Sequence, residues 1–367
     1  MNVQGADNYM VYMNRCLSLA SKGLGSTGTN PMVGAVIVHE SIIIGEAYHR
    51  KYGGAHAEVH AIESVKNKDL LKKSTLYVNL EPCSHHGKTP PCSDLIIRSG
   101  IPHVVIGTKD PNSLVAGKGI EKMTEAGCKV ELGIMEEECR FLNRRFFTFH
   151  EMKRPYIILK WAQSADGFID IIRDQKTKIG PHWISGPYER IMVHKWRSEE
   201  STILVGTNTA EKDNPALNVR YWSGTSPTRL IIDKRLRLAT DLKIFNKEAH
   251  TIIFNYIKSL ESKSPGYVQI NKEDTFWPQI MDYLYGEEFV SLFIEGGAVT
   301  INSLLASGLW DEARIFIGDQ EFHRGVRAPG PIQGKSYDYK TPGANLRIMY
   351  KYSSFELRIN RNNVENA

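Results

Sequence analysis

The sequence contains no long hydrophobic run. Its apolar stretches, such as Gly34 to Val38 and Ile42 to Ile44, have the length of β-strands, far below the ~18 residues that suggest a membrane span. The first twenty residues carry polar and charged side chains among their apolar positions, so no continuous signal-peptide core is available. We therefore expect a soluble, cytoplasmic protein with no membrane partner.

Cysteine is scarce, with five in 367 residues. An odd number at uneven spacing does not fit a disulfide framework and suits a reducing compartment. Each cysteine therefore needs its own explanation. Cys16, Cys128 and Cys139 fall on predicted helices or beside a predicted strand, where we interpret them as packing residues, whereas Cys83 and Cys92 lie among residues that can carry chemistry.

Long runs of like charge are also missing. The net charge is +5, and no run of five or more residues shares one sign in the manner of a nucleic-acid-binding tail. This pattern argues against a nucleic acid partner. A mild basic excess fits a small phosphorylated substrate instead.

The length and composition indicate two folded domains. A prior of ~150 residues per domain suggests two or three domains, and 41% hydrophobic with 24% charged residues allow each half to bury a core. We place the boundary near residue 150, before Lys153-Arg154-Pro155 and a new set of strands. The prediction is one domain at 1–150, a second at 151–359 and a disordered tail at 360–367.

Hydrophobic periodicity predicts an α/β fold for both domains. The first is a compact layered unit, and the second again alternates strands with helices. The predicted helices are 7–24, 57–65, 92–99, 119–127, 136–145, 187–196, 277–284 and 299–307. The predicted strands are 34–38, 42–48, 75–79, 103–108, 129–132, 156–159, 202–205, 229–233, 251–255, 290–294 and 312–317.

A metal site is indicated by residues at the ends of predicted elements. His56 and Glu58 open a helix, Cys83 follows a strand, and Cys92 begins another helix. Zinc accepts one histidine and two thiolates with an open position for water, and thiols at helix N-termini have lowered pKa values. His-x-Glu followed by Pro-Cys and a second cysteine is the signature of zinc base deaminases. We predict a catalytic Zn²⁺ bound by His56, Cys83 and Cys92, with Glu58 as the proton shuttle.

The spacing of the two cysteines departs from the generic signature. Eight residues separate Cys83 from Cys92, where that signature has two, and the polar insert suggests a substrate-recognition loop. A structural zinc site is the competing interpretation, with His85 or His86 as a fourth protein ligand. It would leave Glu58 without a role, so we favour the catalytic site.

The first half carries several extended motifs. They are Thr29 to Gly34, His56 to Ala61, Glu81 to Cys92, Asp110 to Asn112 and Val115 to Gly119. On these motifs the chain resembles the family of bifunctional riboflavin-biosynthesis deaminase/reductases, in which the long cysteine insert is a particular feature. The resemblance implies a three-layer, cytidine-deaminase-like domain that removes the 2-amino group of 2,5-diamino-6-(5-phosphoribosylamino)pyrimidin-4(3H)-one.

The resemblance also implies the substrate contacts of the first domain. They are Asn30, His49, His85, Lys88, Asp110 and Asn112. The chemistry of these residues agrees, because Asn and Asp side chains can read a pyrimidine edge, while a lysine and a histidine can meet a phosphate.

The second half has a glycine pair in place of a Rossmann fingerprint. No Gly-x-Gly-x-x-Gly follows a predicted strand before residue 200. Instead, Glu295-Gly296-Gly297 closes a strand and opens a helix, a geometry that can hold phosphate. Together with Leu204 to Thr209 and Asp213 to Leu217, this motif resembles the reductase half of the same family. That implies a dihydrofolate-reductase-like domain that uses NADPH.

The reductase residues follow from the same resemblance. The implied cofactor contacts are Trp183, Thr209, Asp213, Gly297, Ala298, Val299, Thr300, Ile301, Asn302 and Ser303, and the implied substrate contacts are Arg197, Leu217, Arg220 and Glu295. The cofactor carries the hydride chemistry. Lys160 and Glu295 are the two alternatives for handling the proton.

These observations together predict a riboflavin-pathway enzyme, a hydrolase joined to an oxidoreductase, that forms a homo-oligomer. One alternative is a nucleoside or tRNA deaminase with a C-terminal targeting domain, although a tRNA role predicts a strong basic face that a charge of +5 does not supply. An alternative of another class is a zinc-stabilised binding protein without turnover. In that protein Glu58 would be replaceable.

Overall fold

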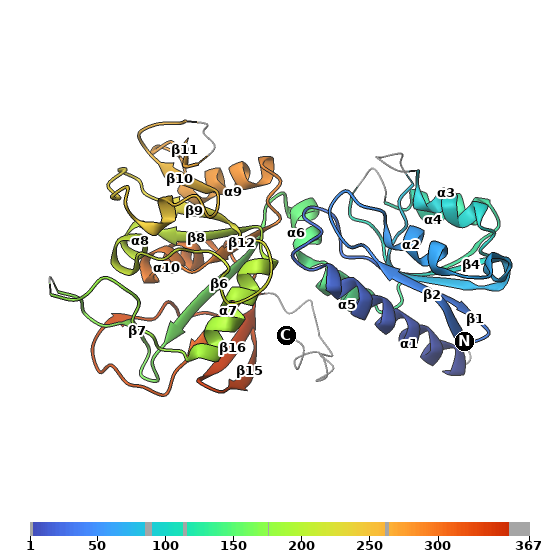
Figure 1. The fold of residues 1–367 in the computed structure, drawn as a ribbon, viewed down its shortest axis with the longest axis horizontal. Coiled ribbons are helices and arrows are strands. Elements are labelled where there is room, and N and C mark those ends of the chain that lie inside the picture. The colour runs from blue at the N-terminus through green and yellow to red at the C-terminus, as the bar shows by residue number, and fades with distance from the viewer. Residues whose placement is uncertain (1–2, 85–89, 113–115, 175, 261–263, 352–367) are drawn as a thin grey trace. The chain divides into compact units, whose positions relative to one another are not determined.

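The computed structural model describes residues 3–84, 90–112, 116–174, 176–260 and 264–351, and Figure 1 shows their fold. Contacts within the chain divide it into two compact units between Met152 and Lys153. We call them the N-terminal unit and the C-terminal unit. Within the described ranges, no helix is long and apolar enough to cross a bilayer.

The N-terminal unit contains a five-stranded sheet with the order β2-β1-β3-β4-β5. β1 (Gly34–His39) runs antiparallel to both β2 (Ile42–Tyr48) and β3 (Thr75–Leu80), so β2 and β3 point the same way. β4 (His103–Thr108) and β5 (Lys129–Leu132) continue parallel to β3. The carboxyl ends of these parallel strands therefore lie at one edge of the sheet, where the loops that follow them meet.

Helices cover both faces of this sheet. They are α1 (Val3–Ala20), α2 (Ala57–Ser64), α3 (Cys92–Arg98), α4 (Lys118–Glu125), α5 (Glu136–Leu142) and α6 (Arg144–Met152), with 3-10 turns at Ser21–Gly23 and Lys68–Lys73. In β3, Leu76 and Val78 pack with α2, α3 and α4 in one core, whereas Tyr77 packs with α1 and α5 in another. Successive strand residues face opposite sides, so the unit has three layers.

The C-terminal unit is built on a nine-stranded sheet with the order β11-β10-β9-β8-β12-β6-β13-β16-β15. The strands from β11 to β13 are parallel, and β16 and β15 add an antiparallel edge. Their bounds are β6 (Tyr156–Gln163), β8 (Thr202–Gly206), β9 (Thr228–Ile232), β10 (Thr251–Asn255), β11 (Gly266–Gln269), β12 (Ser291–Ile294), β13 (Glu312–Ile317), β15 (Lys335–Thr341) and β16 (Ala344–Tyr350). β7 (Phe168–Asp170) pairs separately with β14 (Val326–Arg327).

Helices also cover both faces of the larger sheet. They are α7 (Pro187–Glu199), α8 (Thr207–Asp213), α9 (Phe276–Gly286) and α10 (Ala298–Ser307), with a 3-10 turn at Lys243–Phe245. α9 and α10 pack with Leu204 of β8 on one face, and α7 and α8 pack with Ile203 on the other. A parallel sheet buried on both faces explains the continuous apolar runs of its central strands.

The predicted helices and strands are all present, and most bounds agree within two residues. The predicted helix at 136–145 is wrong in one respect, because the chain leaves the helical path at Asn143. The Asn143 side chain there bonds both backbone polar groups of Met32. The prediction also lacks α6, α8 and the strands β7, β11, β14, β15 and β16. Of these, β7, β11 and β14 have at most four residues, and β15 is mostly polar and exposed.

The interior of the N-terminal unit leaves little free space. Cys16, Cys128 and Cys139 are buried, which confirms their interpretation as packing residues. α1 lies so close to β1 that a Cβ atom on Gly34 would stand 2.1 Å from the carbonyl oxygen of Cys16. No side chain fits between two backbones that approach each other so closely, so only glycine can occupy position 34.

We therefore expect Gly34→Ala to destabilise the N-terminal unit by about 1–3 kcal/mol, the cost typical of an overpacked core. Urea unfolding followed by circular dichroism measures this change. The control is Gly286→Ala in α9, where a Cβ atom would meet nothing within 4 Å. Equal stability of the two variants would contradict the close approach of α1 and β1.

Candidate active sites

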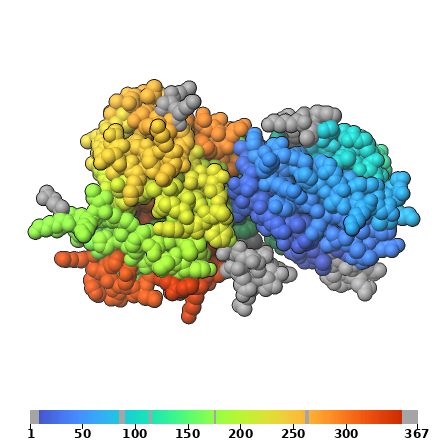
Figure 2. Space-filling view, viewed as in Figure 1, coloured from blue at the N-terminus to red at the C-terminus, as the bar shows by residue number. Residues whose placement is uncertain are grey.

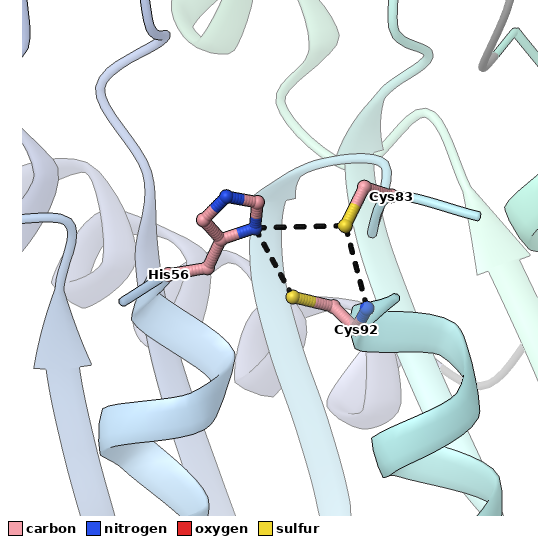
Figure 3. Close-up of side chains that lie close together, drawn as sticks. All are labelled: His56, Cys83 and Cys92. Carbon is pink, nitrogen blue, oxygen red and sulfur yellow. Dashed lines mark hydrogen bonds between the residues drawn. The ribbon is translucent and has the colours of Figure 1, made fainter. Parts of the chain in front are cut away.

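Three ligand-type side chains converge at the edge of the N-terminal sheet (Figure 3). His56 immediately precedes α2, Cys83 follows β3, and Cys92 is the first residue of α3. The His56 Nδ1 atom lies 3.2 Å from Cys92 Sγ and 3.5 Å from Cys83 Sγ, and all three ligand atoms lie within 4.8 Å of one another. A tetrahedral zinc with Zn–S of about 2.3 Å and Zn–N of about 2.0 Å separates such nitrogen and sulfur atoms by about 3.5 Å. The donor set therefore fits zinc.

The pKa shifts of His56, Cys83 and Cys92 also indicate a cation site between these three side chains. A hydrogen bond from the Cys92 thiol, together with one from His56, lowers the pKa of the Cys83 thiol to about 4 in spite of burial. The shared proton raises the pKa of Cys92, and the bond to Cys83 raises the pKa of His56 to about 9. A divalent cation replaces these protons and takes two thiolates and a neutral imidazole as its ligands.

Glu58 lies in the first turn of α2, two residues after His56, and is 3% exposed. Among the residues that the structure describes, none offers a hydrogen bond to its Oε2 atom. Burial raises the pKa of this carboxyl group, although the nearby His56 opposes the shift. A buried polar atom without a partner is rare and needs an explanation. A carboxyl group with a raised pKa suits proton transfer near neutral pH.

Two predicted substrate residues pack beside the ligand histidine. His49 Nδ1 lies 3.1 Å from the carbonyl oxygen of Ala55, and His49 Nε2 lies 3.1 Å from Asn30 Nδ2. Because a carbonyl can only accept, Nδ1 carries the proton and Nε2 accepts from the amide of Asn30. The His49 ring stands edge-on to the His56 ring, with centroids 5.6 Å apart. The structure thus brings Asn30 and His49 to the metal site.

The remaining predicted substrate residues of this unit divide into two groups. Asp110 and Asn112 lie on the loop after β4, where the backbone amide of Asn112 donates to Asp110 Oδ1 at 2.8 Å. His85 and Lys88 lie outside the described residues, as does His86, which was considered as a fourth metal ligand.

A buried glutamate holds the loop after β4. Glu81 directly follows β3, is 4% exposed, and accepts hydrogen bonds from four backbone amides. Its Oε2 atom accepts from Gly117 at 2.9 Å and from Asp110 at 3.4 Å, and its Oε1 atom accepts from Gly119 at 3.0 Å and from Ile120 at 3.4 Å. One side chain therefore joins the strand that leads to the first cysteine ligand, the loop with predicted substrate contacts and the start of α4.

The C-terminal unit contains a cavity of about 1280 Å³. Figure 2 shows a hollow in this unit between its green and yellow segments, which supply much of the lining. Most of the predicted reductase residues line the cavity: Lys160, Trp183, Arg197, Thr209, Asp213, Leu217, Arg220, Glu295, Gly297, Ala298, Val299 and Thr300. The side chains of three others lie elsewhere, since Ile301 packs in the core, Asn302 bonds Gly330, and Ser303 bonds Trp277.

An arginine and a glutamate form a bidentate ion pair in this cavity. Arg197 of α7 donates from Nε to Glu295 Oε1 at 2.6 Å and from Nη2 to Oε2 at 2.8 Å. Burial raises the pKa of Glu295, but Arg197 outweighs it and lowers this pKa to about 2, so the carboxylate stays charged. Lys160 Nζ lies 4.0 Å from Oε2. Burial lowers the pKa of Lys160, which eases the release of its proton.

Several predicted cofactor residues, among them Thr209, Gly297 and Thr300, lie at two neighbouring strand ends. β8 and β12 are paired and parallel, and each leads through glycine into a helix, α8 after Gly206 and α10 after Gly297. A Cβ atom on Gly206 would stand 2.5 Å from Thr300 Oγ1, and one on Gly297 would stand 3.1 Å from Thr209 Oγ1. Glycine and the start of α10 thus provide the close backbone approach that dinucleotide phosphates require, so these residues fit NADPH.

Other predicted contacts of the cavity have defined environments. Trp183 is 57% exposed, and the guanidinium of Arg190 stands 4.6 Å from the centre of its ring. Asp213 accepts a hydrogen bond from Arg173 at 2.7 Å. Leu217 is 2% exposed and has a φ of 49°, which is unusual for leucine and shows that its surroundings hold the backbone.

Comparisons with known proteins assign each unit to a family. Residues 7–108 match the cytidine and deoxycytidylate deaminase zinc-binding region, and residues 155–319 match the RibD C-terminal domain. The first range contains the three ligand residues and Glu58, and the second contains all the predicted cavity residues.

Proteins named riboflavin biosynthesis protein RibD are similar to most of the chain. The one from Aquifex aeolicus is 42% identical over 320 residues, 86% of this chain and 88% of the relative. The Escherichia coli protein is 34% identical over 83% of this chain and 86% of its own length. The chain belongs to the RibD family. A crystal structure from Thermotoga maritima, named as a diaminohydroxyphosphoribosylaminopyrimidine deaminase/5-amino-6-(5-phosphoribosylamino)uracil reductase, is 36% identical with a TM-score of 0.85, covering 94% of this chain and 99% of that chain.

Membership in the RibD family confirms the main predictions. The chain is a bifunctional riboflavin biosynthesis enzyme, in which a cytidine-deaminase-like N-terminal domain is followed by a RibD reductase domain. Its cofactors are Zn²⁺ and NADPH. The alternative of a nucleoside or tRNA deaminase with a targeting domain is not favoured, because a reductase domain occupies the second half.

Two residues of this RibD-family chain are missing from the sequence prediction. Glu81 directly follows an apolar strand and precedes Pro-Cys, and a charged residue at that position is a signal that could have identified it. His194 is 4% exposed and lines the reductase cavity. It lies three residues before Arg197, a spacing that places both side chains on one face of a helix.

We expect Glu81→Gln to lower kcat/KM for ammonia release by about 5–150-fold. A glutamine replaces one oxygen with an NH₂ group that faces two backbone amides, and an unsatisfied buried group costs about 1–3 kcal/mol. Ammonia release measures the effect, and reduction of supplied 5-amino-6-(5-phosphoribosylamino)uracil is the internal control. The exposed Glu125→Gln in α4 is the matched variant. Wild-type deamination by Glu81→Gln would contradict this role.

Proposed function

We propose that the residues assembled above carry out two consecutive steps of riboflavin biosynthesis. The N-terminal unit hydrolyses the 2-amino group of 2,5-diamino-6-(5-phosphoribosylamino)pyrimidin-4(3H)-one. The C-terminal unit then reduces the ribosyl group of the product to ribityl. The observation that supports this proposal most directly is the convergence of His56, Cys83 and Cys92 near Glu58, a buried carboxyl group whose Oε2 atom has no partner within the described ranges.

For deamination, we assign one task to each side chain of the metal site. His56, Cys83 and Cys92 would hold the zinc, which would supply an activated water by lowering its pKa from about 15.7 to about 7. Glu58 accepts a proton from the attacking water and passes it to the departing nitrogen, so that water adds and ammonia leaves. Its burial supports this cycle, because a carboxyl group with a raised pKa can both bind and release a proton near neutral pH.

Substrate recognition in the N-terminal unit falls to the polar side chains around the metal. The bonded pair of Asn30 and His49 stands beside His56, and it reads the edge of the pyrimidine together with Asp110 and Asn112. His85 and Lys88 contact the 5-phosphate, a role that suits a hydrogen-bond donor and a flexible cation.

The first test concerns the proton shuttle. Glu58→Gln keeps the size of the side chain and cannot carry the proton, so we expect ammonia release to fall by about 10²–10⁴-fold, the contribution typical of general acid-base catalysis. The chain should still bind one zinc, measured by atomic absorption, and should reduce supplied 5-amino-6-(5-phosphoribosylamino)uracil as before. Ammonia release at the wild-type rate would exclude Glu58 as the shuttle.

For reduction, the electrostatics favour Lys160 over Glu295 as the proton donor. NADPH supplies the hydride when it is bound. Reduction of the opened ribosylamine adds this hydride to carbon and a proton to nitrogen. Arg197 keeps Glu295 ionised with a pKa of about 2, so Glu295 has no proton to give. Lys160 is a cation whose pKa burial lowers, and we assign the proton to it, with Glu295 and Arg197 as binding groups.

The second test separates these two residues. Lys160→Met should lower the kcat of the reductase by about 10²–10⁴-fold, with NADPH affinity unchanged. Because only protonated Lys160 can donate, the wild-type rate should fall as the pH rises through its lowered pKa, and this alkaline limb should vanish in the variant. Glu295→Gln should mainly raise the KM for the pyrimidine. Loss of kcat in Glu295→Gln but not in Lys160→Met would reverse the assignment.

A further inference from the structure

The segment between α8 and β9 has little backbone support of its own. Residues 214–227 include no helix or strand, yet they contain Leu217 and Arg220, which line the reductase cavity. Polar backbone groups that lack ladder partners must find them elsewhere when they are buried. Side chains of α7 supply such partners to this segment.

Two residues of α7 that are three positions apart, His194 and Arg197, bind the backbone of this segment. Arg197 donates from Nη1 to the carbonyl oxygen of Asn218 at 3.1 Å, while it also binds Glu295. His194 accepts at Nδ1 from the backbone amide of Arg220 at 3.0 Å. A donor and an acceptor on one helix face thus hold a carbonyl and an amide two residues apart.

The side chain of Arg220 is joined to the same network. Its Nη1 atom donates to Asn218 Oδ1, and Asn218 Nδ2 donates in turn to Glu248 Oε2 at 2.6 Å. Arg220 is therefore held at both ends. Its backbone amide is bound by His194, and its guanidinium is bound by the side chain of Asn218, which Glu248 holds in turn. Displacing the backbone at Arg220 would move this cation relative to the Arg197–Glu295 pair.

The surroundings of His194 hold its ring in place and keep it in the neutral form that can accept a hydrogen bond. It is 4% exposed, and its ring stands against that of Tyr221 with centroids 4.7 Å apart. Burial, with the charges of Arg197 and Arg220, lowers its pKa to about 4. The imidazole is therefore neutral at physiological pH, with Nδ1 free to accept and the proton on Nε2.

We propose that His194 is a positioning residue of the reductase, which aligns Arg220 with its anionic pyrimidine substrate by accepting the Arg220 backbone amide. The inference rests on the proposed substrate contact of Arg220. It requires no contact between His194 and the substrate itself. It differs from a packing role because it depends on one ring nitrogen and not on the volume of the ring.

Two substitutions separate positioning from packing. In His194→Asn the Oδ1 atom can take the place of Nδ1 and accept from Arg220, whereas in His194→Gln the polar group stands at the place of Nε2 and the amide of Arg220 loses its acceptor. Both variants remove the ring from Tyr221. Any loss that comes from packing should therefore be similar in the two.

We expect His194→Gln to raise the KM for 5-amino-6-(5-phosphoribosylamino)uracil by about tenfold or more, as for one lost hydrogen bond to a buried amide. Its kcat and its KM for NADPH should change little, and His194→Asn should restore most of the substrate affinity. Ammonia release by the N-terminal unit should be normal in both variants. Equal effects of Asn and Gln, or a loss in kcat and NADPH affinity alone, would overturn the proposal.

A third variant distinguishes two ways in which the proposal could fail: either His194 does not position Arg220, or Arg220 does not contact the substrate. Arg220→Met should raise the same KM, and adding His194→Gln should then have little further effect, because the two residues act through one contact. An unchanged KM in Arg220→Met would refute the substrate contact. A raised KM in Arg220→Met with a normal KM in His194→Gln would refute the positioning role alone.

Discussion

The carboxyl edge of a parallel sheet is the constraint on which both sites depend. In the N-terminal unit β2, β3 and β4 end at one edge, and His49, Cys83 and Asp110 follow them within a few residues. In the C-terminal unit β8 and β12 lie side by side. β8 ends at Gly206, and β12 ends directly before Glu295. Parallel pairing brings together residues that are distant in sequence, and open α/β sheets bind ligands at this edge for that reason.

Placing a site at the edge of a sheet leaves loop backbone groups without regular hydrogen-bond partners, and buried side chains supply those partners. Loops that leave a sheet edge lose the regular partners of their backbone groups. Glu81 offers its two oxygens to four amides in the N-terminal unit, and the His194 and Arg197 pair offers an acceptor and a donor in the C-terminal unit. Each of these residues lies on or directly after a regular element. The rigid part of the fold thereby fixes the loop that carries the chemistry.

This division of roles explains what could be predicted from sequence. His56, Glu58, Cys83 and Cys92 stand close to the predicted element ends, and their residue types restrict the chemistry, so local pattern and spacing were enough to propose a site. Glu81 and His194 act on backbone groups that are 29 and 26 residues away in sequence. No spacing rule connects a side chain to a distant amide. The break at Asn143 has the same origin, because its partner Met32 is 111 residues away.

Glu58 and Glu295 show how environment divides roles between identical side chains. Burial raises the pKa of Glu58, and the nearby His56 opposes this shift without reversing it. The Glu295 side chain is 9% exposed, and burial raises its pKa as well, but the bidentate Arg197 reverses this effect and lowers the pKa to about 2. A carboxyl group that can change its protonation state is suited to proton transfer, whereas one that is locked as an anion is suited to orienting charges around it. Because Arg197 also holds Asn218, the ionisation of Glu295 and the position of the substrate loop depend on the same guanidinium, which makes Arg197 the point where electrostatics and loop geometry of the reductase are joined.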